Sequence, residues 1–392
     1  MNININNPTI LAILFSLYIP FFPGFSLFFA HIFFIVWVFI VAISNARFIS
    51  LNILLISIFA FFILVMSIYN VIFIDMGDRY IQDTIKIFML VFSVIILSSF
   101  KSSHELMKIL LGMIIILPIV IIFYIIFIHD GSLFTYSNRF YIKFFGSPNV
   151  LGLVAGLSLI IIFFSTKISS IVKIFIIVLY AAIIILGFSR AVIIGLMLAM
   201  MTSKKGLYTL MLVTTLIAIV LVILHITNIY ILPDWVLMKI GLAEGAASIG
   251  NDERHIVWNA TLLQIFDSTT SFLFGNTPGK EIVELGYGKI AKHPHNTYLF
   301  SLWAYGLIGF IFFIFSILVM IKNVFSSKEY RQMKISLLIF YLTVFLMDTH
   351  ILAGQFLIIH IFILSFLFSK NNIQYLKKSI YLSSNKLHTK RI

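Results

Sequence analysis

Apolar residues dominate the chain in long uninterrupted runs, and short polar segments separate one run from the next. Each run has about 20 residues, the length that an α-helix needs to cross a bilayer. A membrane β-barrel is excluded, because its strands alternate apolar and polar residues over about ten positions. The pattern predicts an all-α polytopic membrane protein with about twelve transmembrane helices. We expect these helices at 9–22, 24–44, 48–69, 85–100, 107–128, 148–165, 170–188, 190–203, 207–227, 297–320, 335–347 and 351–369.

The segment 228–296 departs from this pattern, because it contains no apolar run of membrane-spanning length. It carries two tryptophans, Gly, Pro and charges of both signs, which favours a folded subdomain over a linker. Within it, residues 252–266 have apolar side chains at helical spacing, behind Asn251 or Asp252 as a helix cap. The apolar positions of this expected helix are Ile256, Ala260, Leu263 and Phe266. We therefore expect one membrane domain, 1–392, with a partly helical loop subdomain between the ninth and tenth helices.

The composition excludes several classes of protein. Of the 392 residues, 61% are apolar and 10% are charged, and the mean hydropathy is +1.11. Soluble domains have about 25% charged residues, and no aqueous fold hides so much hydrocarbon surface. A water-soluble enzyme, a nucleic-acid-binding domain and a disordered protein are therefore excluded. The chain has no cysteine, which excludes disulfides, thiolate metal sites and cysteine nucleophiles.

Orientation in the membrane explains the net charge of +13. Short loops that carry Lys and Arg stay in the cytoplasm. With the N-terminus inside, 17 of the 27 basic residues fall on the cytoplasmic side, but only Glu105 and Glu329 of the 14 acidic residues do. The basic residues on this side include Lys173, Lys205, Lys322 and Lys334. This charge distribution predicts two cytoplasmic termini and an extracytoplasmic segment 228–296. It also predicts a basic cytoplasmic tail, 370–392, lying against anionic headgroups.

Arg190 is a candidate functional residue because apolar helix is expected on both sides of it. An ionisable residue at membrane depth is costly, and a guanidinium there needs an anionic partner or an aqueous cavity. The alternative is that Ser189 and Arg190 form a short loop at the outer interface, where the arginine extends towards water. Both interpretations place this arginine on the outer side of the membrane.

His295 is a second candidate, in a polar segment directly before the expected helix at 297. Histidine takes and returns a proton near neutral pH, which suits acid or base chemistry. His293 and His295 could instead be a metal pair, but no third ligand with suitable spacing follows, and we predict no metal site. The alternative is that both histidines are interfacial turn residues and that Asn296 caps the helix.

Arg254, at the start of the expected loop helix, presents a planar fork of donors that suits phosphate oxygens. Its alternative role is an ordinary ion pair with Asp252 or Glu253. Arg139 and Lys143 have aromatic neighbours and precede another expected helix, where they could contact a phosphate or a sugar. Anchoring at the membrane interface is the alternative for this pair.

Several motifs of nucleotide and hydrolase chemistry are missing from the sequence. There is no Gly-rich phosphate loop with lysine, no Asp-x-Asp motif, no Gly-x-Ser-x-Gly elbow and no His-Glu-x-x-His motif. Cytoplasmic nucleotide chemistry therefore has no support. Arginines and a histidine on the outer side suit an anionic, lipid-linked substrate.

Taken in order, four groups of residues resemble the O-antigen ligase and O-antigen polymerase superfamily of bacterial envelope glycosyltransferases. Together they cover most of 135–310, and the long loop between the ninth and tenth helices fits the same family. The groups are Arg139 with Gly146-Ser147-Pro148-Asn149-Val150-Leu151-Gly152; Phe188-Ser189-Arg190-Ala191; Arg254-His255-Ile256-Val257-Trp258 with Phe274-Gly275-Asn276; and His295-Asn296-Thr297-Tyr298-Leu299 with Tyr305-Gly306-Leu307-Ile308-Gly309.

The resemblance implies a GT-C-like architecture in the bacterial inner membrane and a transfer at the periplasmic face that needs no metal or cofactor. The implied donor is an oligosaccharide linked to undecaprenyl diphosphate. Arg190 and Arg254 would hold the donor diphosphate, and His295 would act on the acceptor hydroxyl as a base or orienting group. Possible secondary positions are Arg139, Lys143, Asn296 and His293, of which His293 does not belong to the shared pattern. Many relatives have glycine where this chain has Ala191.

We expect an O-antigen polymerase, whose acceptor is a second lipid-linked repeat unit and whose partners are membrane lipids and a chain-length regulator protein. An O-antigen ligase, with lipid A-core as the acceptor, is the alternative within the family. A polysaccharide transporter or flippase is a further alternative. It predicts repeated halves and helices broken at the midplane, and the sequence shows neither. A structural membrane scaffold is another alternative, but it would not explain the presence of Arg190, Arg254 and His295.

Overall fold

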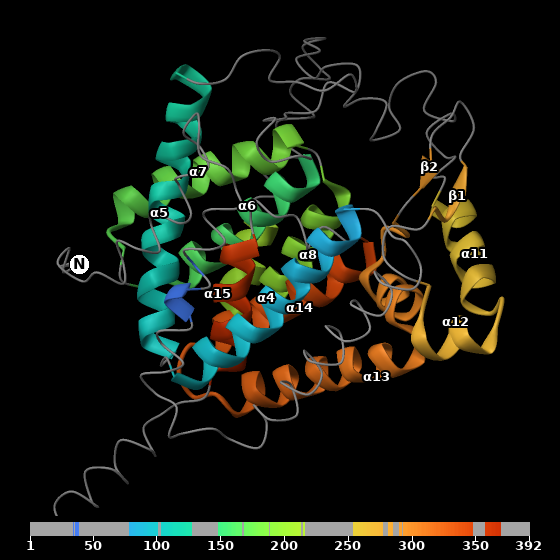
Figure 1. The fold of residues 1–392 in the computed structure, drawn as a ribbon. Helices are drawn as coiled ribbons and strands as arrows, with labels where there is room; N and C mark the ends of the chain where they lie inside the picture. Colours follow the sequence, from blue (N-terminus) through green and yellow to red (C-terminus); the bar gives the residue numbers. More distant parts are fainter. Residues whose placement is uncertain are drawn as a thin grey trace, which may run out of the picture.

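The structure is a computed structural model, and its described residues are mostly helical (Figure 1). It describes residues 34, 36–38, 78–100, 103–127, 148–166, 168–187, 189–212, 215, 254–276, 281–284, 290–291, 293–347 and 357–369. The helices are α4 (Asp78–Phe100), α5 (Ser103–Phe127), α6 (Pro148–Phe164), α7 (Ser170–Gly187), α8 (Arg190–Met201), α11 (Arg254–Ile265), α12 (Thr269–Phe274), α13 (Thr297–Ser326), α14 (Arg331–Met347) and α15 (Leu357–Phe368). The strands are β1 (Val283–Glu284) and β2 (Ile290–Ala291).

Several helix starts lie where the apolar runs predicted them, as α6, α7, α8 and α13 show. Other bounds differ, since α4 already begins at Asp78, α14 begins at Arg331 and α13 continues to Ser326. Hydropathy reports the apolar run, whereas a helix can continue through polar residues beyond it. The expected helices at 9–22 and 48–69 lie outside the described residues, as do the tail 370–392 and all but a few residues of the expected helices at 24–44 and 207–227.

Two helices, α5 and α13, are long and apolar enough to cross a membrane, with 25 and 30 residues respectively. Apolar stretches of α4, α6, α7, α8 and α15 are shorter than this. The described residues therefore show a mostly helical chain with two candidate membrane spans.

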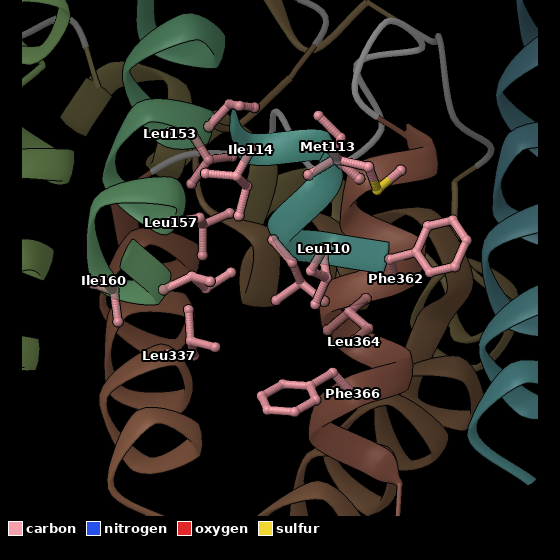
Figure 2. Packing of buried hydrophobic residues seen from close by; sticks show 14 of the residues in the cluster. Leu110, Met113, Ile114, Leu153, Leu157, Ile160, Leu337, Phe362, Leu364 and Phe366 are labelled. Atoms are coloured by element: carbon pink, nitrogen blue, oxygen red, sulfur yellow. The ribbon is translucent and has the colours of Figure 1, made fainter. Parts of the chain in front are cut away.

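The main core lies where α4, α5, α6, α8, α14 and α15 meet. Figure 2 shows Leu110 and Ile114 of α5 between Leu157 of α6 and Phe362 of α15. Small residues let the helices approach closely, since a Cβ added at Gly156 would lie 2.7 Å from a ring carbon of Phe340. The α6, α8 and α14 helices therefore pack as one compact unit.

Helix α14 runs antiparallel to both α8 and α13. Near its start, Gln332 donates to the carbonyl of Thr202, which follows α8. Near its end, Val344 faces Gly195 in the first half of α8, and the Phe345 ring lies 6.3 Å from the ring of Tyr298. The starts of α8 and α13 therefore lie at the same end of the bundle as the end of α14.

Residues 254–291 add α11, α12 and a small antiparallel sheet beside the start of α13 (Figure 1). In this sheet Val283 pairs with Ala291. The sequence pattern does not predict these strands, which are only two residues long. A second hydrophobic core joins these elements to α13, and it contains Val257, Ile265, Ile282, Ala291, Phe300, Trp303 and Ala304.

The expected loop helix forms as α11, but of its four predicted apolar positions only Ala260 packs against this core. Leu263 and Phe266 are 75% and 65% exposed, and Ile256 is also exposed. The buried face instead consists of Val257, Thr261 and Ile265. Helical spacing therefore located the helix, whereas the packing of α13 decides which of its faces is covered.

Candidate functional site

Arg190 is the first residue of α8, and its side chain is exposed. The preceding helix α7 ends at Gly187, and Ser189 has extended backbone angles at the N-cap position. Arg190 therefore lies at a break between two helices and not within one continuous helix. This position leaves the guanidinium accessible to an anionic group.

His295 lies in a strained turn directly before α13. Its φ angle is 51°, in the left-handed region that residues other than glycine adopt uncommonly. Asn296 is the N-cap, and its Oδ1 accepts a hydrogen bond from the backbone N–H of Leu299 at 3.0 Å. This is the capping role that the sequence allowed for Asn296. A left-handed residue held in place by its surroundings is common at functional sites.

The first turns of α11 meet the turn that carries His295. The indole N–H of Trp258 donates to the carbonyl of Pro294 at 2.7 Å. Arg254 lies four residues before Trp258 on the same helix, which places the two residues on one face. One hydrogen bond thus links the neighbourhood of Arg254 to the residue that precedes His295.

Arg190 is linked to this region through α14. Tyr298, one turn after His295, packs on Phe345, and the adjacent Val344 faces Gly195 of α8. The three predicted site residues are therefore carried by elements that gather at one end of the bundle. Helix α11 is linked to the turn of His295 by the hydrogen bond from Trp258 to Pro294, whereas Arg190 is linked to it only through α14.

The remaining predicted positions divide into two groups. The half-buried His293 ring lies 5.8 Å from the ring of Phe300 on α13. Arg139 and Lys143 lie outside the described residues.

A close crossing of two backbones holds this region together. Gly306 has φ 63° and ψ −172°, which interrupts the helical conformation of α13. A Cβ added there would lie 2.4 Å from the carbonyl of Leu273. Gly275, with φ 92°, faces the carbonyl of Ala304 at the same distance. Glycine is required at both positions, because each has a left-handed φ and touches the other segment's backbone.

Hydrogen bonds reinforce the crossing. The backbone N–H of Asn276 donates to the carbonyl of Trp303 at 2.7 Å. Gln264 of α11 accepts from the Trp303 indole N–H at 2.9 Å and donates to the carbonyl of Ile282 at 3.0 Å. No pattern in the sequence marks Gln264, because only the folded structure brings its partners together.

Lys334, which the charge pattern placed in a cytoplasmic segment, is fully buried at the opposite end of α14. Its ammonium group donates to the Ser369 carbonyl at 2.9 Å and to Ser103 Oγ at 3.1 Å. It also lies 4.8 Å from the centre of the Phe366 ring. Burial lowers the pKa of Lys334 to about 8, and Glu329 opposes this change. Lys334 thus ties α5, α14 and the end of α15 together, away from the site.

The arrangement supplies two kinds of chemistry. Guanidinium groups form strong, charge-assisted hydrogen bonds to phosphate oxygens, and a histidine can accept a proton from a hydroxyl. Within the described ranges, no group of three or more His, Asp or Glu side chains is placed to hold a metal ion.

Comparison of the chain with models of known protein families gives no match, and comparison with curated proteins gives none either.

Proposed function

We propose that the chain is a polytopic protein of the bacterial inner membrane, with both termini in the cytoplasm. Two observations support this location besides the two long apolar helices and the charge distribution. First, large apolar side chains form an exposed stripe along α7, where Ile174 and Ile185 are each 63% exposed. Second, Ile126 and Phe127 are similarly exposed on α5. Soluble monomers rarely expose contiguous apolar surfaces of this kind, whereas lipid covers them in a membrane.

Within this membrane protein, we propose an enzyme that transfers glycan from undecaprenyl diphosphate to a sugar hydroxyl at the periplasmic face. The acceptor is another lipid-linked repeat unit, so the product is a longer O-antigen or related surface polysaccharide. The observation that carries this proposal is the hydrogen bond from Trp258 to Pro294, which brings the start of α11 beside His295. In the proposed enzyme, Arg254, His295 and Arg190 contact one substrate.

The proposed reaction breaks the bond between the anomeric carbon and the diphosphate oxygen and forms a bond from that carbon to the acceptor oxygen. Arg190 and Arg254 stabilise the negative charge that develops on the departing undecaprenyl diphosphate. His295 orients the acceptor hydroxyl and takes its proton as the new bond forms. In this proposal, the side chains of Arg190 and Arg254 stabilise the leaving group.

Alanine substitutions test the assignment of these residues. We expect His295→Ala, Arg190→Ala and Arg254→Ala each to abolish the lipopolysaccharide ladder on a gel while the protein remains in the membrane. Lys322→Ala is the matched control, because it removes an exposed cation from the far end of α13. Normal ladders from the His295 or Arg190 variant would refute the site.

A deletion strain separates the two acceptors. Loss of a polymerase leaves lipid A-core that carries a single repeat unit. Loss of a ligase leaves bare core together with accumulated lipid-linked polymer. The first pattern is the one we expect, and the second would reassign the enzyme to the ligase reaction.

A further inference from the structure

Two lysines share one aromatic ring at the end of α6 opposite the candidate site. The ammonium groups of Lys173 and Lys205 lie 5.9 and 5.3 Å from the centre of the Phe163 ring. Phe163 belongs to the last turn of α6, Lys173 to the start of α7 and Lys205 to the helical segment 204–212. Three segments therefore bring two like charges to one place.

The two lysines differ in how they are held. The Lys173 ammonium donates to the carbonyls of Phe163 and Ser165 at 2.7 and 2.9 Å, which satisfies the end of α6. Lys205 is exposed and contacts the same ring from its own segment. Within the described part of the chain, no carboxylate forms an ion pair with either lysine. Because like charges repel, an anion between them would relieve an unfavourable interaction.

An exposed apolar surface adjoins this pair of lysines. Along α7, exposed side chains follow Lys173 at helical spacing, and they are Ile174, Phe175, Val178 and Ile185. Tyr208, Met211 and Leu212 are exposed on the segment that carries Lys205. A ligand that fits both surfaces has an anionic head and hydrocarbon chains.

We propose that Lys173, Lys205 and the Phe163 ring bind the phosphate of an anionic phospholipid, whose acyl chains lie along the exposed stripe of α7. The sequence places both lysines on the cytoplasmic side, where the leaflet is rich in anionic lipid. A free phosphate ion would use the lysines but not the apolar stripe. The site requires only the proposed membrane location and not glycosyl transfer.

Native mass spectrometry of the full chain in neutral detergent tests this site, with phosphatidylglycerol as the probe. We expect one retained lipid that phosphatidylcholine does not replace. Lys205→Gln should weaken its binding about fivefold, as expected for one basic residue near an anionic headgroup. Lys205→Gln is preferred to Lys173→Gln, because Lys173 also binds the end of α6.

Lys322→Gln is the matched control, because it removes another exposed cation that the sequence places on the cytoplasmic side. Unchanged phosphatidylglycerol binding by Lys205→Gln would overturn the proposal. Equal retention of phosphatidylcholine would also overturn it, as would complete competition by inorganic phosphate at concentrations comparable to the lipid. All three outcomes can be read without an assay of glycan synthesis, so they remain distinct from a failure of the proposed enzyme.

Discussion

Replacing Gly306 with alanine tests whether the crossing of α13 with the α12 segment holds the candidate site in place. The backbone at Gly306 adopts φ 63° and ψ −172°, which a residue with a side chain rarely adopts. The added methyl carbon would also lie 2.4 Å from the carbonyl of Leu273, so one backbone must move away from the other. The substitution therefore disturbs two features at once.

Each feature has a typical cost. A residue forced into a sparsely populated conformation costs about 1–3 kcal/mol, and an extra methyl group in a packed site costs about 1–3 kcal/mol. We expect Gly306→Ala to lower the unfolding free energy by about 4 kcal/mol, a large fraction of the stability of a typical domain. Gly275→Ala should cost a similar amount, because it meets the carbonyl of Ala304 at the same distance.

Thermal unfolding of the purified protein in detergent measures this effect. Gly112→Ala is the matched control, since nothing lies within 4 Å of a Cβ added there in the middle of α5. Alanine at that position should stabilise the helix by about 0.5–1 kcal/mol. The double variant Gly275→Ala with Gly306→Ala should cost less than the sum of the two, because both residues belong to one crossing. Gly306→Ala with wild-type stability would refute the reasoning.

Three further substitutions test other contacts. Trp258→Phe removes the hydrogen bond to Pro294, and we expect transfer activity to fall about tenfold while unfolding free energy falls by about 1 kcal/mol. Gln264→Leu leaves the Trp303 indole N–H unpaired, so unfolding free energy in a denaturant titration should fall by about 2 kcal/mol. In the wild type, the unfolding free energy should rise from pH 8 to 10.5. Burial lowers the pKa of Lys334 to about 8, so in this range the folded protein has lost the lysine proton and no longer bears the cost of burying the charge. Lys334→Met should abolish this rise.

Matched measurements separate these effects from general damage. Ser326→Ala removes a hydrogen bond at the far end of α13 and should leave transfer activity unchanged. Wild-type activity in Trp258→Phe would show that the hydrogen bond does not position His295. For Lys334, the exposed Lys322→Met variant should keep the pH dependence of the wild type. A wild-type pH profile in Lys334→Met would contradict the assignment of that dependence to the buried ammonium.

The apolar pattern predicted much of the helical structure because that signal is local. The starts of α6, α7 and α13 follow from the change between polar and apolar residues at 148, 170 and 297. The start of α4 at Asp78 could not be found in this way, because its first turns are polar. Periodicity also located α11 but not its buried face, which depends on where Trp303 of α13 lies.

The candidate site was predictable only as a set of residue types on the outer side. The sequence indicates that Arg254 lies on a loop helix and that His295 precedes a long helix. The helix of Arg254 and the turn of His295 are joined by a hydrogen bond between Trp258 and Pro294, which are 36 residues apart. Local patterns do not reveal such a contact. Gly275 and Gly306 belong to the motifs that carry the family resemblance, but their role in the crossing of α13 with the α12 segment depends on backbone angles that only the folded chain shows.

The kink at Gly306 divides α13 into two parts with different attachments. The first part carries the cap at Asn296 and packs through Trp303 against α11 and the small sheet. The later part packs in the main core with α14, where Met320 and Val324 are buried. His295 and Arg254 thus lie on the part formed by α11, the small sheet and the first turns of α13, whereas Arg190 begins a helix of the main bundle. Tyr298 of the first part also packs on Phe345 of α14, so this contact and the geometry at Gly306 together set how the elements that carry these residues lie relative to one another. Accordingly, substitution at this glycine should reduce glycan transfer even under conditions in which the protein remains folded.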